Sequence, residues 1–211
     1  RNKGVPSGDW GGVAACQLPE TYEILNVIKP LTTVYENPDV NTAGMDLDIY
    51  LRLMGWYVSD GTMTFYKDRP KDLRILCYSK KSTVYQNLIK FSNSNRLDYI
   101  LDSREYEEGK YEYSFRFGRD VAEALYADCG HLSREKRLPT WAYGLTRRMG
   151  SFLLNAMLKG DAYKRPHAEQ TYTYYTVNSL LADDVQILAV LMGYESTRYG
   201  PYDHPNQFTD N

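Results

Sequence analysis

Two apolar helical segments, each ending on an aspartate, constrain the fold of this chain more than any other feature. Residues 49 to 65 read "IYLRLMGWYVSDGTMTF", an apolar run that reaches Asp60-Gly61 and then becomes β-branched and aromatic. Residues 150 to 165 read "GSFLLNAMLKGDAYKR" and repeat the plan with Gly160-Asp161. A helix C-terminus carries roughly −0.5 charge, so a carboxylate is locally unfavourable there. One Asp-Gly pair is a common turn signal. Two copies at matching places predict that the two helix ends have a common function.

The elements around the first aspartate predict an α+β subdomain. The periodicity favours helices over 47–59, 82–92 and 119–128, and strands over 62–67 and 72–79 on either side of the turn "KDRPKD". Residues 97–117 are typical of a hairpin that turns at Gly109 and carries Tyr111, Tyr113, Phe115 and Phe117 on one face.

The same order of elements restarts in the second half of the chain. We expect a helix over 150–159, a strand over 171–177 and a helix over 179–192. Aligning "YSKKSTVYQNLIKF" with "YTVNSLLADDVQIL" matches Lys81 with Asn178 and Leu88 with Val185. An internal repeat at half the chain length indicates a pseudo-two-fold α+β structure.

These patterns divide the chain into four parts. We expect an N-terminal extension over 1–46, a first subdomain over 47–130, a connecting segment over 131–149 and a second subdomain over 150–211. The second subdomain is short, because no counterpart of the 97–117 hairpin follows "GYESTRYG".

Composition narrows the class of protein. No apolar run reaches the ~20 residues that span a bilayer, so we expect no membrane partner. Three cysteines without close pairing favour a reducing, intracellular compartment. The three histidines have no metal-ligand spacing, which argues against zinc.

Charge is segregated along the chain. The net charge of −2 counts against a nucleic-acid binder unless basic residues gather in one place. They do so over 67–81, where Asp68 and Asp72 are outnumbered by Lys67, Arg69, Lys71, Arg74, Lys80 and Lys81. This segment is the predicted electrostatic contact with DNA.

The paired aspartates predict a metal site. Gly55 and Ala156 stand at matching positions, five residues before each aspartate, and their small size lets the helices approach closely. Two carboxylates side by side repel, and one takes up a proton unless a cation lies between them. Oxygen ligands and concentrated negative charge are what Mg²⁺ prefers.

The segments "LMGWYVSDG" and "LLNAMLKGDA" resemble the two motif copies of the LAGLIDADG homing endonucleases. "SREKRLPTWAYGLTRRMGSFLLNAMLKGDA" and "YTVNSLLADDVQILAVLMGY" resemble the intein-encoded, monomeric branch of that family. The resemblance covers residues 47 to 196. It implies a fold with the two motif helices at its centre and curved antiparallel sheets that form a saddle over duplex DNA. It also implies site-specific, metal-dependent double-strand cleavage.

The resemblance assigns roles to individual residues. Asp60 and Asp161 become metal ligands, aided by main-chain carbonyls near Ser59 and Gly160. Lys81 and Asn178 become polar groups near the active sites, with Lys80 as a rival of Lys81. The DNA-facing set comprises the basic segment together with Arg116, Lys164, Arg165 and Tyr175.

Two other classes remain open from sequence. One is a catalytically inactive relative that binds DNA or RNA, in the manner of an intron maturase. The other is an unrelated α+β binding protein. Retention of both aspartates favours the nuclease, because a protein that only binds needs no paired acids.

Overall fold

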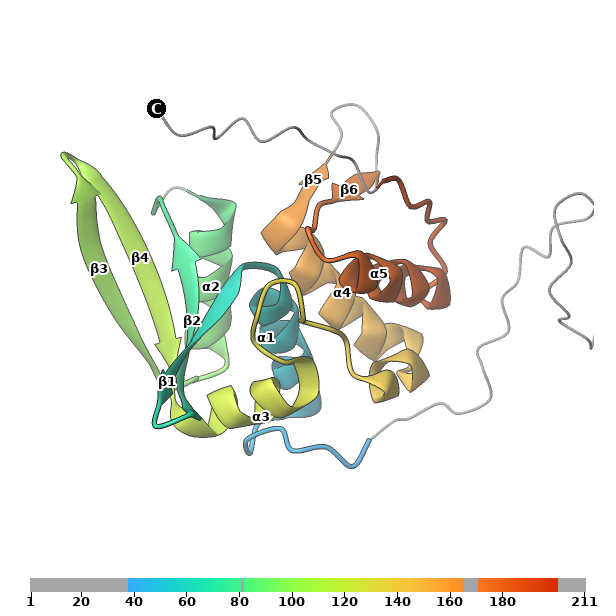
Figure 1. Ribbon diagram of the computed structural model, residues 1–211, viewed down its shortest axis with the longest axis horizontal. Helices are drawn as coiled ribbons and strands as arrows, with labels where there is room; N and C mark the ends of the chain where they lie inside the picture. The colour runs from blue at the N-terminus through green and yellow to red at the C-terminus, as the bar shows by residue number, and fades with distance from the viewer. Residues whose placement is uncertain (1–37, 81, 165–170, 201–211) are drawn as a thin grey trace, which may run out of the picture.

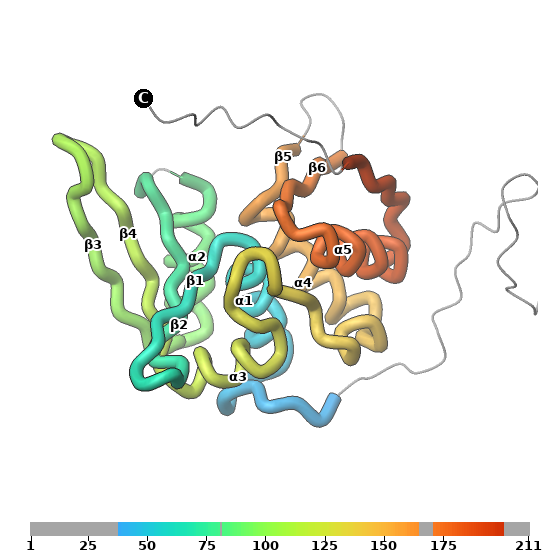
Figure 2. Tube along the Cα trace, viewed as in Figure 1, coloured from blue at the N-terminus to red at the C-terminus, as the bar shows by residue number. Residues whose placement is uncertain are grey.

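Two helices lie side by side at the centre of the molecule (Figures 1 and 2). The computed structural model describes residues 38–80, 82–164 and 171–200. Helix α1 spans Leu47–Asp60 and α4 spans Arg147–Asp161, so each ends on its aspartate. Helix α4 begins earlier than expected, because the Thr146 side chain accepts a hydrogen bond from the Met149 amide and caps the helix there.

The contact between α1 and α4 is closest at Gly55. A Cβ at this position would lie 2.6 Å from the Cβ of Ala156 and 2.7 Å from the carbonyl oxygen of Leu153. Both distances are shorter than any real carbon contact, so only glycine lets the helix backbones approach this far. The predicted contact between Gly55 and Ala156 is confirmed.

A four-stranded antiparallel sheet follows α1. Its strands are β1 (Gly61–Tyr66), β2 (Arg69–Cys77), β3 (Tyr99–Glu107) and β4 (Lys110–Phe117), in the order β1-β2-β4-β3. The β1–β2 turn is tighter than predicted and consists of Lys67 and Asp68, with φ of 48° and 60°. Such two-residue turns match the twist of the strands they join. Pro70 is tolerated inside β2 because β4 pairs with β2 only from Leu73 onward.

One face of this sheet carries the core. Leu73, Ile75, Phe115 and Phe117 are almost fully buried there. Helices α1 and α3 (Arg119–Cys129) pack against β2. Helix α2 (Thr83–Ser94) sets the ring of Tyr85 edge-on to Phe115, with ring centroids 5.4 Å apart. The sequence pattern is confirmed for Phe115 and Phe117.

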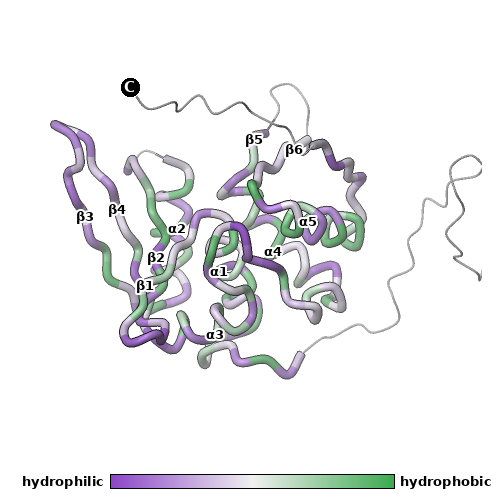
Figure 3. Tube along the Cα trace, in the orientation of Figure 1, coloured by the Kyte–Doolittle hydropathy of each residue, from purple (hydrophilic) through white to green (hydrophobic). Residues whose placement is uncertain are grey.

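The outer end of the β3–β4 hairpin differs from its base. Tyr111 is predicted to lie on the same face as Phe115 and Phe117, which are buried, yet it is 42% exposed. Figure 1 shows the hairpin extending beyond the helices, and Figure 3 shows mostly hydrophilic residues there. Alternation along a strand fixes the direction of a side chain, but burial also needs a layer to pack against.

The second half repeats the beginning of the first. Helix α4 is followed by β5 (Ala162–Lys164), β6 (Tyr172–Tyr174) and α5 (Ser179–Leu191), as α1 is followed by β1, β2 and α2. Strands β5 and β6 form an antiparallel pair. A short 3₁₀ helix, Thr140–Gly144, lies against α5. Within the described residues the second sheet has two strands where the first has four.

The class of the fold is therefore α+β with antiparallel sheets. None of the helices in residues 38–80, 82–164 and 171–200 combines the length and apolar character needed to cross a membrane.

Replacing Gly55 by alanine tests the central contact. The added methyl group meets the α4 backbone, which cannot move as a side chain can, so we expect a loss of stability of about 1–3 kcal/mol. Helix propensity alone predicts a gain of about 1 kcal/mol. Urea unfolding measures the difference. Gly118→Ala is the control without steric contact, since a Cβ there meets nothing within 4 Å; as Gly118 is the N-cap of α3, it should show only the smaller cost of alanine at an N-cap. An unchanged or raised stability of Gly55→Ala would contradict the close packing.

Candidate active site

Asp60 and Asp161 meet where α1 and α4 end. Both carboxyl groups are half-buried and close enough to share a hydrogen bond. Burial raises the pKa of both groups. The pKa of Asp161 rises to about 6, first through burial and then through the charge of Asp60. Asp161 therefore holds a proton to higher pH than an ordinary carboxyl group.

Gly160 makes this approach possible. A Cβ on Gly160 would lie 2.5 Å from the Cβ of Ser59 and 3.3 Å from Oδ2 of Asp60. The Ser59 hydroxyl donates to the carbonyl oxygen of Met157 at 3.1 Å and lies 3.3 Å from the hydroxyl of Tyr174. Ser59 thus ties the end of α1 to α4 and β6. The roles of the Ser59 and Gly160 carbonyls as metal ligands remain predictions.

The chain leaves the two aspartates in the same way. Strand β1 begins at Gly61, directly after Asp60, and β5 begins at Ala162, directly after Asp161. Each carboxylate therefore sits at the junction of a central helix and the first strand of a sheet.

Lys136 is a third charged group at this site, and sequence reasoning missed it. Its side chain is buried, and Nζ donates to the carbonyl oxygens of Tyr57 at 2.8 Å and Gly61 at 2.6 Å. Burial lowers the pKa of Lys136 to about 8, while the negative charges of Asp161 and Asp60 act in the opposite direction. Lys136 lies in the charged segment "SREKR", where the local sequence does not distinguish a buried lysine from an exposed one. Its burial could therefore not be predicted.

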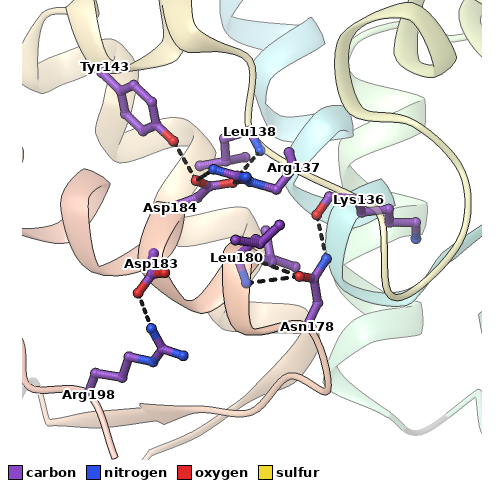
Figure 4. A network of polar contacts seen from close by, with 10 residues as sticks. Lys136, Arg137, Leu138, Tyr143, Asn178, Leu180, Asp183, Asp184 and Arg198 are labelled. Carbon is purple, nitrogen blue, oxygen red and sulfur yellow. Dashed lines mark hydrogen bonds and ion pairs between the residues drawn. The ribbon is translucent and has the colours of Figure 1, made fainter.

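Asn178 holds the backbone of Lys136. Its Nδ2 donates to the Lys136 carbonyl oxygen at 2.7 Å, and its Oδ1 accepts from the amides of Leu180 and Leu181 (Figure 4). It is therefore the N-cap of α5 and is only 3% exposed. Asn178 was predicted to act at the active site. In the structure its side chain binds the backbone carbonyl oxygen of Lys136.

Asp184 anchors the next two residues. It is fully buried and accepts two hydrogen bonds from Arg137, at 2.6 and 2.7 Å. It also accepts from the Leu138 amide at 2.9 Å and the Tyr143 hydroxyl at 2.7 Å (Figure 4). Burial alone would raise the pKa of Asp184, but these hydrogen bonds outweigh it and lower the pKa. The aspartate pair "DD" in the second repeat gave no sign of this role.

The predicted DNA-facing arginines lie on the sheet face opposite the core. Arg74 of β2 and Arg116 of β4 are directly opposite each other. Arg74 pairs with Asp72 at 2.8 Å, and Arg116 pairs with Asp102 at 2.9 Å. The Arg116–Asp102 pair is partly exposed, and such pairs contribute little stability. Asp72 is buried, and against the effect of burial its pKa is lowered by the hydrogen bond from Arg74.

The remaining predicted contacts are spread along the strand ends. The exposed members are Lys67, Arg69, Lys71, Lys80, Lys164 and Tyr175. The Nζ of Lys80 lies 5.1 Å from the ring centroid of Tyr113, which holds it beside β4. Lys81 and Arg165, and most of the expected extension over 1–46, lie outside the described residues.

No protein-family model and no curated protein matches this chain. Within the described residues, no group of three or more histidine, cysteine, aspartate or glutamate side chains gathers as a metal cluster. The candidate site therefore rests on two carboxylates, the carbonyl groups beside them and Lys136.

Replacing Asp161 by asparagine tests the crowding of the two acids. The folded-state pKa of about 6 lies above the unfolded value of about 4. The folded protein therefore binds the proton more tightly, and stability falls as pH rises from about 4 to about 6. Without divalent metal, Asp161→Asn should be more stable than the parent at pH 7 by about 1 kcal/mol, allowing for solvent screening. At pH below 4 the difference should vanish.

Urea unfolding across this pH range measures the effect. Asp46→Asn, at the exposed other end of α1 and without a side-chain capping bond, is the control and should show no such trend. Destabilisation of Asp161→Asn at pH 7 would indicate instead that the carboxylate has a structural role.

Proposed function

We propose that the protein is a site-specific DNA endonuclease of the LAGLIDADG homing endonuclease type, which cuts both strands of a long duplex target. The observation that carries the proposal is the meeting of Asp60 and Asp161 at paired helix ends. Burial raises the pKa of both carboxyl groups, and the charge of Asp60 raises the pKa of Asp161 further. Groups perturbed in this way cluster at functional sites.

The architecture supports the finer fold of that family. Each central helix leads through its aspartate into an antiparallel sheet, and a second helix follows in both halves. We propose that the two halves are related by a pseudo-two-fold axis between α1 and α4. The open faces of the two sheets would then flank the acids as a saddle for DNA, and one chain would suffice as a monomer.

The donor set fits a small divalent cation such as Mg²⁺. Two carboxylates and adjacent main-chain carbonyls offer oxygen ligands only, as Mg²⁺ prefers. Asp60 and Asp161 would hold the ion, with the carbonyl groups of Ser59 and Gly160 beside them. A divalent cation held there supplies Lewis acidity, which polarises the phosphate and makes a water molecule more acidic.

Lys136 complements the acids in this proposal. Two of its three N–H donors bind the Tyr57 and Gly61 carbonyls, which leaves one for a phosphate oxygen. With a pKa of about 8, its ammonium group is charged at neutral pH yet exchanges its proton readily. During hydrolysis a water oxygen bonds to phosphorus and the ester bond to deoxyribose breaks. Lys136 would stabilise the negative charge that builds up on the phosphate.

Cleavage selection on a randomised duplex library with Mg²⁺ tests the activity and yields the target. On that target, Asp60→Asn and Asp161→Asn should each lower the cleavage rate by about 10²-fold or more, because a principal electrostatic group is lost. DNA binding should persist, since the strand contacts are unchanged. Asp46→Asn should cut as the parent does. Variants of Asp60 and Asp161 that still cut at the parent rate would remove these acids from the chemistry.

The same assay separates the nuclease from a relative that only binds. Selective binding of duplex DNA or RNA, with no cutting in Mg²⁺ or Mn²⁺, would favour the maturase-like alternative. No nucleic-acid binding at all would favour the unrelated binding protein.

Binding to duplex DNA should weaken steeply with salt, because basic side chains release condensed counterions. Arg74→Gln and Lys71→Gln should each reduce the slope of log affinity against log salt by about 1. Fluorescence anisotropy between 50 and 300 mM salt, roughly the range in which such slopes are resolved, measures it. Lys110→Gln, at the exposed hairpin tip where Lys110 pairs with Glu107, is the control. A salt-independent affinity would mean that the basic strands do not face DNA.

A further inference from the structure

A cavity of about 470 Å³ lies between α1, α2 and α4, and the acid pair does not line it. Its size is within the range of small-molecule sites. Each helix contributes one face, with residues spaced three, four or seven apart. The lining residues are Arg52, Trp56, Asn87, Lys90, Phe91, Ser94, Asn95, Phe152, Asn155, Ala156 and Lys159.

The lining of this cavity is positively charged. Arg52, Lys90 and Lys159 contribute three cations, and no carboxylate is among the lining residues. In the part of the chain that the structure describes, none of the three forms an ion pair. The chain as a whole carries a net charge of −2. Three cations without an acidic partner around one cavity therefore produce a local positive potential, which the net charge of the chain does not indicate.

Arg52 is held in place at the cavity wall. Its guanidinium carbon lies 4.3 Å from the ring centroid of Phe152, and Arg148 approaches the same ring at 5.4 Å. The Nε of Arg52 is buried and has no hydrogen-bond partner among the described residues. A buried donor without a partner is uncommon and costly. Because Nε is enclosed by protein atoms, the terminal guanidinium nitrogens are the groups of Arg52 that could donate to a bound anion. A guanidinium held against an aromatic ring is also already oriented to donate to two oxygens of one phosphate group.

We propose that this cavity binds a compact phosphate-bearing anion, either inorganic pyrophosphate or the phosphate end of a nucleotide. A multiply charged phosphate matches three cations, whereas a carboxylate would neutralise only one. The amide side chains of Asn87 and Asn155 can donate further hydrogen bonds to phosphate oxygens. The site is independent of the proposed cleavage chemistry.

Isothermal titration of the full chain in EDTA with phosphate, pyrophosphate and ADP tests the proposal. Pyrophosphate should bind more tightly than phosphate because it carries more charge. ADP equal to pyrophosphate would identify the phosphates as the recognised group, and tighter ADP would add a contribution from the nucleoside. Absence of binding by all three at millimolar concentration would overturn the proposal.

Variants locate the binding. Lys90 and Lys159 are exposed, so glutamine at either position should leave the fold intact. Each substitution should weaken pyrophosphate binding about fivefold, and the double variant about 25-fold. Arg52→Lys, which keeps the charge but loses the planar fork, should also weaken binding.

Lys71→Gln is the matched control, because it removes an exposed lysine that does not line the cavity. It should leave pyrophosphate binding unchanged, as should Asp60→Asn. Equal weakening by Lys71→Gln, or unchanged binding by the double variant, would overturn the site. DNA cleavage by the Lys90 and Lys159 variants is expected at the parent rate, so the outcome is separable from that of the proposed nuclease activity.

Discussion

The close approach of α1 and α4 is the constraint on which the other features depend. Gly55 brings the two backbones together in the middle of the helices, and Gly160 allows contact with Ser59 at their ends. Because the helices run side by side to their last residues, Asp60 and Asp161 must share one half-buried space. The sheets then diverge from that point, since β1 and β5 begin at the next residue. Two small residues therefore determine where charge collects and where the open sheet faces lie.

The parts of the fold that sequence could predict are those set by local patterns. Apolar periodicity located α1, α4 and α5, and alternation located the strands that bury Phe115 and Phe117. The β1–β2 turn is shorter than the predicted turn "KDRPKD", because Arg69, Pro70 and Lys71 already belong to β2. The exposure of Tyr111 could not be predicted, because burial there depends on whether a helix reaches that far along the hairpin.

The residues of the candidate site also fall into those that local patterns predict and those that they do not. The paired aspartates could be predicted, because each is the end of a repeated motif and the repeat brings them together. Lys136 and Asp184 could not, because their roles depend on contacts 79 and 47 residues away along the chain. Asn178 was singled out from its place in the repeat, and the structure shows it to be a helix cap that also binds the Lys136 carbonyl. A long-range partner has no signature in one sequence when the residue lies in a charged segment.

The segment Lys136–Leu138 connects the two halves of the molecule through side-chain and backbone hydrogen bonds. Lys136 binds the end of α1, while the adjoining Arg137 and Leu138 bind Asp184 of α5. Consecutive residues are thus hydrogen-bonded to the first half of the chain at α1 and to the second half at α5. Pulling the halves apart would break one of these two attachments and leave either the buried Asp184 carboxylate or the buried Lys136 ammonium group without its partners, which is strongly destabilising. The two repeats should therefore melt together in one cooperative transition, although each has its own helix and hairpin.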